Sequence, residues 1–495
     1  MSNLTGFDSE AVGFDCVTQD SRPCKSSSSQ TTEFSASGAG SQTSTSKDIG
    51  CMVHPDDLTV EDDVLKEYPP PGLNEFLRRV VPGVMEQLQH NDRQLLDNSS
   101  DSDEEEVLTA KLLQEIQVKP DGSGDHQASV LGVSWSGTGN SLAVSVGRAQ
   151  HDAWCHHTGV IRVYTLKRSE DRFVHTTDIT EKNCVTVLQY HPNVAALLAY
   201  GTTSGEVVLC NLRNGGLDEG TQLASPGGCH GARRVSALRW ADAPLAEAFL
   251  MMQTSRRGER RGAADQVLIS AGSDGSLVAW RANASAQVFQ RIVGYAVDAA
   301  RGSAPDITCF DFIRSSPLRP LAEKTPDDIF VVGSKTGKLF LCKIQPPHSQ
   351  SELLDPVYDV LEGHATCVLD VAFNSQRPGV FVSVSMDSEL RVYDIAQETP
   401  LKVMCLDAPI SCMCWLSPPC VVVGLSSCEE LLRVYNVCGG RALPVGGLSG
   451  RANVSCLAVS HSGSCRIAAG DECGTVRVWE LPSRRIKLSA LDLDF

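Results

Sequence analysis

The strongest constraint on the fold of this chain is a pattern that recurs through its C-terminal three quarters. Each copy has an alternating apolar run, a turn, a run of small and apolar residues, a tight turn, and a run ending near an aromatic residue or a cysteine. The last three copies begin about 44 residues apart. The copies begin at Ser129, Val185, Val235, Ile307, Cys367, Ile410 and Val454. Self-similarity of this kind indicates an array of one supersecondary unit.

The runs within each copy are typical of β-strands. They are short, alternating or wholly apolar, and are separated by Gly, Asp, Asn and Ser. Asp274-Gly275 and Thr336-Gly337 fit tight hairpin turns, in which glycine takes a positive φ. A single unit of this kind cannot bury both of its faces, so the units must stack radially and close a ring. We therefore predict an all-β fold, a seven-bladed β-propeller over residues 126–495.

Short motifs in the copies resemble the WD40 repeat. Gly363-His364 precedes the fifth copy, Asp387 lies at its turn, and Tyr393-Asp394 and Trp479-Glu480 occupy closing strands. Several copies lack these pairs, so the set is degenerate. We expect His364 and Asp387 to form a hydrogen-bonded pair that locks the blade rather than a catalytic pair.

The N-terminal quarter differs from the propeller in charge and in apolar content. Residues 1–125 hold 24 acidic and 9 basic side chains, whereas residues 126–495 are close to neutral. This balance argues against nucleic-acid binding. Residues 1–68 have few large apolar groups and are predicted to be a disordered acidic arm. No apolar run is long enough to span a membrane, and we expect no membrane insertion.

Residues 69–97 carry the spacing of an amphipathic helix. The apolar positions, which step by three and four, are Leu73, Phe76, Leu77, Val80, Val81, Val84, Met85 and Leu88. Pro82-Gly83 is expected to kink or split the helix. Because the stripe lies outside the repeats, we expect it to dock into a separate partner; packing on the propeller is the alternative.

Residues 98–125 are predicted to form an acidic linker that ends in a second short helix. Asp101 to Glu106 suit a helix N-terminus, and Leu108, Leu112 and Ile116 form a stripe at helical spacing.

One cluster in the first blade contains residue types that bind zinc, namely His151, Asp152, Cys155, His156 and His157. Adjacent residues on a strand point to opposite faces, so His156 and His157 could not both face one ion there. A loop arrangement is the alternative. We predict no metal site, no cofactor and no catalytic residues. The cysteines mostly occur singly in apolar runs, which is typical of reduced, buried thiols in the cytosol.

Three stretches together resemble the dynein intermediate chain family, and its cytoplasmic dynein 2 branch in particular. "LNEFLRRVVPGVMEQL" is similar to the family's helix for roadblock-type light chains. The first blade is similar in a loop that contains His151, Asp152 and Trp154. Two Gln-Thr pairs in the arm resemble the family's light-chain motifs. The resemblance covers nearly the full chain.

The resemblance implies a non-catalytic adaptor for retrograde intraflagellar transport and cilium assembly. Its propeller would bind the tail of a dynein heavy chain, its helix a roadblock-type light chain, and its arm other light chains. The implied arm residues are Ser29, Gln30, Thr31, Ser41, Gln42 and Thr43. A second intermediate chain would complete the complex, in the cytoplasm, cytoskeleton, cilium or flagellum and basal body. The alternatives are an intermediate chain of an axonemal dynein or of dynein 1, and a WD40 substrate receptor of a ubiquitin ligase.

Overall fold

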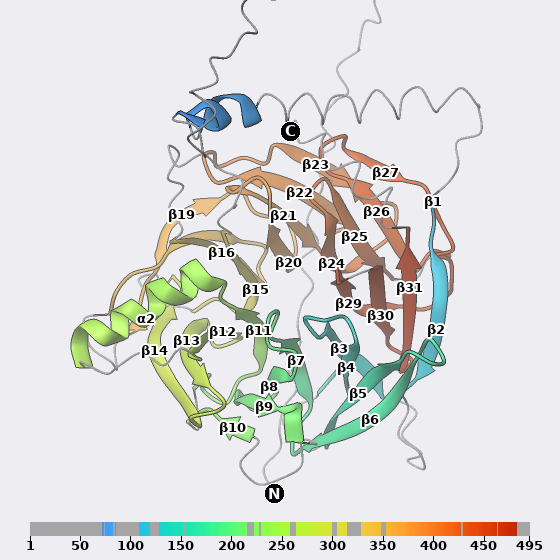
Figure 1. Cartoon of the computed structure of the whole chain (residues 1–495), viewed down its shortest axis with the longest axis horizontal. Helices are drawn as coiled ribbons and strands as arrows, with labels where there is room; N and C mark the ends of the chain where they lie inside the picture. The colour runs from blue at the N-terminus through green and yellow to red at the C-terminus, as the bar shows by residue number, and fades with distance from the viewer. Residues whose placement is uncertain are drawn as a thin grey trace, which may run out of the picture. The chain divides into compact units, whose positions relative to one another are not determined.

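The computed structural model divides the chain into two compact units, Met1–Asp103 and Glu104–Phe495. The described residues are 72–73, 75–82, 85, 108–118, 128–151, 155, 157–214, 222–226, 229–257, 264–298, 304–313, 328–347, 353–426, 429–462 and 464–482. In the first unit the described residues are mostly helical. The second unit holds a ring of sheets (Figure 1).

The ring consists of seven sheets, each with four antiparallel strands, which confirms the predicted seven-bladed β-propeller. Blade 1 contains β3 (Ser129–Trp135), β4 (Ser141–Gly147), β5 (Gly159–Lys167) and β6 (Arg172–Glu181). Blade 2 contains β7 (Val185–Tyr190), β8 (Leu197–Thr202), β9 (Val207–Asn211) and β10 (Gln222–Ala224). Blade 3 contains β11 (Val235–Trp240), β12 (Gln266–Gly272), β13 (Ser276–Asn283) and β14 (Val288–Ala296), with β18 (Leu353–Leu354) added in parallel at the edge.

The remaining blades follow in chain order. Blade 4 contains β15 (Ile307–Phe312), β16 (Ile329–Ser334), β17 (Leu339–Lys343) and β19 (Val357–Leu361). Blade 5 contains β20 (Val368–Phe373), β21 (Val380–Ser385), β22 (Glu389–Asp394) and β23 (Lys402–Cys405). Blade 6 contains β24 (Ile410–Ser417), β25 (Cys420–Leu425), β26 (Leu432–Asn436) and β27 (Arg441–Leu443). Blade 7 contains β29 (Val454–Ser460), β30 (Cys465–Asp471), β31 (Thr475–Leu481) and β2 (Lys111–Gln117).

The hydrophobic core lies between the blades. Every residue of the second strands β8, β16, β21 and β25 is buried, because both faces of each blade contact a neighbour. Among the described residues, the buried apolar side chains form seven clusters, and each cluster joins two adjacent blades. The predicted hairpins are also confirmed, with φ of 83° at Gly275 and 85° at Gly337. Burial at each interface explains why the repeat needs a closed ring.

Tryptophans on innermost strands tie neighbouring blades together with a repeated hydrogen bond. The indole Nε1 of Trp240 donates to the Gln189 carbonyl of blade 2 at 3.2 Å. Trp415 donates to the Ala372 carbonyl of blade 5 at 3.2 Å. Trp135 donates across the ring closure, from blade 1 to the Ala458 carbonyl of blade 7 at 3.2 Å. A buried indole N–H needs such a partner, so these bonds fix the spacing of the inner strands.

The prediction of a second helix near residues 108–116 was wrong. Residues Lys111–Gln117 form β2, which pairs antiparallel with β31 and completes blade 7. Leu112 is 47% exposed whereas Ile116 is 7% exposed, so the two do not share a buried helical face. A bulge between Leu112 and Gln114 shifts the side-chain alternation, which hid the strand pattern. The propeller therefore begins before residue 126, and its last sheet combines β2 from the start of the propeller sequence with three strands from its end.

Three smaller elements decorate the ring. The strand β1 (Leu108–Thr109) pairs in parallel with β28 (Val445–Gly446). A short 3-10 helix, η3 (Leu212–Asn214), follows β9. The helix α2 (Ala243–Arg257) follows β11, and it was not predicted. Its Leu245 amide donates to the Asp242 carboxylate at 3.1 Å, which caps the helix start.

Candidate functional site

The first candidate binding element is the helix of the N-terminal unit, where residues 75–82 and 85 are helical. Phe76, Leu77, Val81 and Met85 are 50%, 42%, 47% and 51% exposed. These four residues, which we call the apolar helix face, are helical and belong to the predicted apolar stripe. Leu73 and Val80 are half-buried.

The other predicted arm and helix residues lie outside the described residues. These comprise the side chains of Val84 and Leu88 and the six arm residues Ser29, Gln30, Thr31, Ser41, Gln42 and Thr43. Pro82 is helical and Gly83 is not described, so the expected kink stays a prediction.

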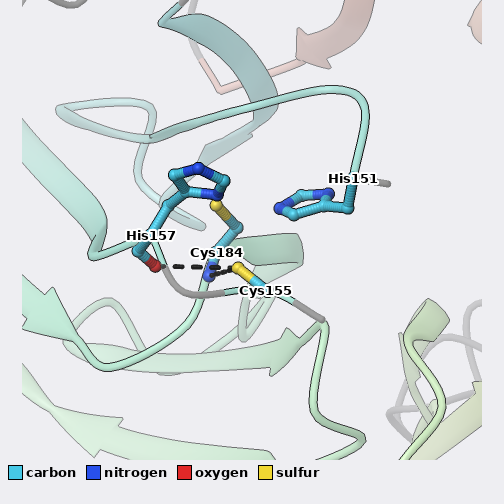
Figure 2. Close-up of side chains that lie close together, drawn as sticks. All are labelled: His151, Cys155, His157 and Cys184. Carbon is cyan, nitrogen blue, oxygen red and sulfur yellow. Dashed lines mark hydrogen bonds between the residues drawn. The ribbon is translucent and has the colours of Figure 1, made fainter. Parts of the chain in front are cut away.

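The second candidate is a group of four side chains in blade 1, which we call the His–Cys cluster (Figure 2). His151, Cys155 and His157 come from the connection between β4 and β5, and Cys184 comes from the connection between β6 and β7. The nitrogen and sulfur atoms that could act as ligands all lie within 4.8 Å of one another. The imidazole centroids of His151 and His157 are 5.5 Å apart. Figure 2 shows the side chains converging from two separate loops.

Hydrogen bonds orient the sulfur of Cys155 within the cluster. The Cys184 backbone amide donates to Cys155 Sγ at 3.3 Å, and this thiol in turn donates to the His157 carbonyl at 3.6 Å. Burial alone would raise the pKa of the Cys155 thiol, but hydrogen bonds with the Cys184 amide, Thr203 and His157 together outweigh burial, and the pKa is lowered. Burial raises the pKa of Cys184 to about 11. Burial and then the nearby His157 lower the pKa of His151, so its ring is neutral at pH 7.

Sequence reasoning found three members of this cluster but missed Cys184. The argument against a metal site assumed that His156 and His157 lie on a strand. His157 instead lies in a loop, where the alternation of side chains along a strand does not hold, and His156 is not described. Cys184 is 29 positions from Cys155, and no local spacing links the two.

The polar pair predicted at His364 takes a different form from the one expected. His364 Nε2 bonds the Ser383 hydroxyl at 2.6 Å, whereas Nδ1 lies 3.9 Å from the Asp387 carboxylate, beyond hydrogen-bond length. The locking bond therefore goes to Ser383. The Arg391 guanidinium forms an ion pair with the Glu389 carboxylate at 2.7 Å, so this carboxylate, which lies beside His364, already has a partner. Burial, and then the charge of Arg391, lower the pKa of His364 to about 4.

Blade 3 holds the fuller version of this network. His230 Nε2 bonds the Ser270 hydroxyl at 2.8 Å, and its Nδ1 bonds the Ser276 hydroxyl at 2.9 Å. Trp280 Nε1 donates to the same Ser270 oxygen at 2.9 Å. These groups are buried and mutually satisfied, which is a structural arrangement rather than a reactive one.

The remaining features of the second unit bear on other sequence predictions. Within the described ranges, no helix has the length and apolar character needed to cross a bilayer. The described cysteines form no disulfide with one another.

Comparison with known proteins agrees with this architecture. The family described as "WD domain, G-beta repeat" matches residues 356–394 and 443–480, which fall in blades 4, 5 and 7. Mouse "Cytoplasmic dynein 2 intermediate chain 2" is 23% identical, over 84% of this chain and 77% of its own length. The human protein of that name is 22% identical, over the same shares. "Dynein intermediate chain 2, ciliary" of Heliocidaris crassispina is 23% identical, over 62% of this chain and 40% of its own length.

The fold and the matched repeats define a WD-repeat β-propeller protein. Within that class, the chain is similar to dynein intermediate chains, including those of cytoplasmic dynein 2. The resemblance predicted from the sequence is confirmed.

Proposed function

We propose that this chain acts without catalysis as an adaptor in a cytoplasmic dynein 2 complex for retrograde intraflagellar transport and cilium assembly. Its N-terminal unit binds light chains, its propeller binds the tail of a heavy chain, and a second intermediate chain joins it in the complex. The observation that carries the proposal is similarity to dynein 2 intermediate chains over 84% of the chain. A rigid ring of seven blades supports a binding role, because its loops are displayed on a fixed scaffold.

The apolar helix face supports the light-chain part of the proposal. Four large apolar side chains on helical residues of this unit are each at least 42% exposed. Amphipathic helices of this kind dock into hydrophobic grooves through residues spaced three and four apart. Roadblock-type light chains are the proposed partners.

The paired tripeptides of the arm supply a second, independent contact in this proposal. Each Ser-Gln-Thr would add a strand to the exposed edge of a dimeric light chain, with main-chain hydrogen bonds giving affinity and the Gln-Thr side chains giving specificity. Two anchors on one arm raise the effective concentration of the second binding event to the order of mM.

Affinity purification of the full chain from ciliated cells tests both contacts. We expect dynein heavy chain and light chains in the wild-type sample. The double variant Phe76→Asp/Leu77→Asp should lose roadblock-type light chain and keep the others, because charge on the face opposes docking. Met386→Asp is the matched control, since Met386 is 62% exposed but lies in the propeller, and it should keep the roadblock chain. Recovery of neither heavy chain nor roadblock chain with wild type would overturn the proposal.

A truncation separates the two units. Residues 104–495 retain β2 and hence the complete ring. This fragment should lose all light chains and retain the heavy chain at reduced yield. Replacement of Gln30-Thr31 and Gln42-Thr43 by Ala pairs in the full chain should remove only the light chain that binds the arm, as measured by calorimetry.

A second candidate is an axonemal intermediate chain, which the similarity to the ciliary sea-urchin protein favours. Deletion of the gene distinguishes the two. Short cilia support intraflagellar transport, whereas paralysed cilia of normal length support the axonemal role.

A further inference from the structure

We propose that His151, Cys155, His157 and Cys184 form a structural Zn²⁺ site that fastens the β4–β5 connection of blade 1 to the β6–β7 connection. This assigns a metal site to a chain for which none was expected, and it is independent of the proposed function.

The chemistry of the four side chains selects zinc. Two thiolates and two imidazoles form the Cys₂His₂ set of structural zinc sites, which have four protein ligands in a tetrahedron. Bonds of about 2.3 Å to sulfur and 2.0 Å to nitrogen place tetrahedral ligands roughly 3.3–3.8 Å apart. The candidate atoms already lie within 4.8 Å of one another, so a shift of about 1 Å completes the tetrahedron. Two thiolates would also neutralise the charge of the ion.

Two nitrogen atoms of the cluster lack a partner within the described structure. His151 Nε2 and His157 Nδ1 are both buried as atoms, and neither has a hydrogen-bond partner there. Buried polar atoms are nearly always satisfied, so unsatisfied ones need an explanation. A metal ion between the rings would satisfy both nitrogens at once.

The backbone around Cys184 holds it close to the β4–β5 connection. A side chain at Gly159 would lie 2.3 Å from the Asn183 carbonyl oxygen and 3.0 Å from Cys184 Cα. A side chain at Gly147 would lie 3.0 Å from Cys184 Sγ. The glycines at the end of β4 and the start of β5 therefore permit the approach of the two loops. The Cys184 amide, which donates to Cys155 Sγ, is the kind of second contact that orients a metal-bound thiolate.

The place of the cluster in the ring gives the metal a structural role. The connection before β11 is held to its blade by His230, and the connection before β20 is held by His364. In the connection before β7, Cys184 lies directly before the strand and close to the β4–β5 connection of blade 1. Zinc would fasten this connection, as histidine hydrogen bonds fasten the connections before β11 and β20.

The test uses the reduced, chelator-treated full chain with Zn²⁺ or Co²⁺ as the probe. We expect one equivalent of Zn²⁺ per chain, a rise in melting temperature on adding it, and a Co²⁺ spectrum of tetrahedral, thiolate-bound metal. Cys184→Ser and Cys155→Ser should each weaken Zn²⁺ binding by at least about tenfold and abolish the sulfur-to-cobalt band. Cys473→Ser, at an exposed cysteine in the β30–β31 turn, is the control and should bind as wild type.

Further variants keep the test decisive. If Cys184→Ser fails to fold, His151→Ala should show the same loss. The triple variant Cys16→Ser/Cys24→Ser/Cys51→Ser should keep the site, because its cysteines precede the propeller. Absence of Zn²⁺ binding by the reduced wild type, an octahedral Co²⁺ spectrum, or binding unaffected by both Cys155→Ser and Cys184→Ser would each overturn the proposal. A Cys155–Cys184 disulfide that persists in reductant and excludes the metal would also overturn it.

Discussion

Because β2 is the closing strand of the ring, we predict different losses of folding stability on truncating two of its aliphatic residues, Leu112 and Ile116. Ile116 is 7% exposed and lies in the core between blades 7 and 1, whereas Leu112 is 47% exposed on the same strand. Ile116→Ala should lower the free energy of unfolding by about 2–4 kcal/mol, because it removes buried methyl groups and leaves a cavity. Leu112→Ala should cost less than about 1 kcal/mol, since its side chain is already half in water.

Urea unfolding of the full chain, followed by tryptophan fluorescence and by circular dichroism, measures both values. Trp479 lies on β31 and pairs with Leu112 across the ladder, so its fluorescence reports on the closing sheet. The experiment distinguishes a strand from a helix, because a helix over residues 108–116 would place both side chains on one face, and the two variants would then lose similar free energies of unfolding. Equal losses for the two variants, or no loss for either, would refute the closing strand.

Three further predictions concern single groups in the ring. The pKa of His364 is about 4 in the folded protein and about 6.5 when unfolded, so only the unfolded chain binds the extra proton between these pH values. The free energy of unfolding of wild type, measured in urea, should therefore fall by about 3 kcal/mol from pH 6.5 to pH 4. His364→Asn should show a shallower pH dependence, and parallel curves for the two proteins would contradict this. Ser270→Ala should lower the free energy of unfolding by about 2–4 kcal/mol in the same assay, because it removes the hydrogen-bond partner of His230 and Trp280. The control Ser236→Ala loses one 3.2 Å bond to the Ala271 carbonyl and should lower it by about 1 kcal/mol. Comparable losses for the two variants would argue against a shared network. Gly159→Ala should lower both the melting temperature and the Zn²⁺ affinity, because its Cβ would lie 2.3 Å from the Asn183 carbonyl oxygen. The control Gly439→Ala, whose Cβ would have its nearest atom at 3.6 Å, should leave the Zn²⁺ affinity unchanged. A Gly159→Ala variant with the melting temperature and Zn²⁺ affinity of wild type would contradict the close approach of the two loops.

The blade count was predictable because each blade is local in sequence. Strands such as β20, β21 and β22 lie within 27 residues, and their apolar runs and turn glycines are visible in one window. The exposed residues of the apolar helix face were predictable for the same reason, since a helix repeats every few residues.

The closing strand and Cys184 were not predictable, because both depend on long-range partners. β2 pairs with a strand more than 350 positions away, as the hydrogen bond between Gln117 and Thr475 shows, and its bulge disguised the alternation. The helix periodicity of Leu108, Leu112 and Ile116 was real but local, and tertiary pairing overrode it. Cys184 joins the cluster only because the fold brings the β4–β5 connection of blade 1 beside the connection from blade 1 to blade 2.

The pairing of β2 with β31 also means that the ring can close only late in translation. β2 leaves the ribosome among the first propeller residues, but its partner β31 is made about 358 residues later. At roughly 5–20 residues per second, translation leaves β2 without its partner for about 20–70 s. During that interval blades 1 to 6 can form in order while the first and last faces of the growing stack stay open, and an open strand edge can pair with another chain. Nascent chains halted before residue 475 should therefore engage chaperones, and release should depend on the last blade rather than on chain length.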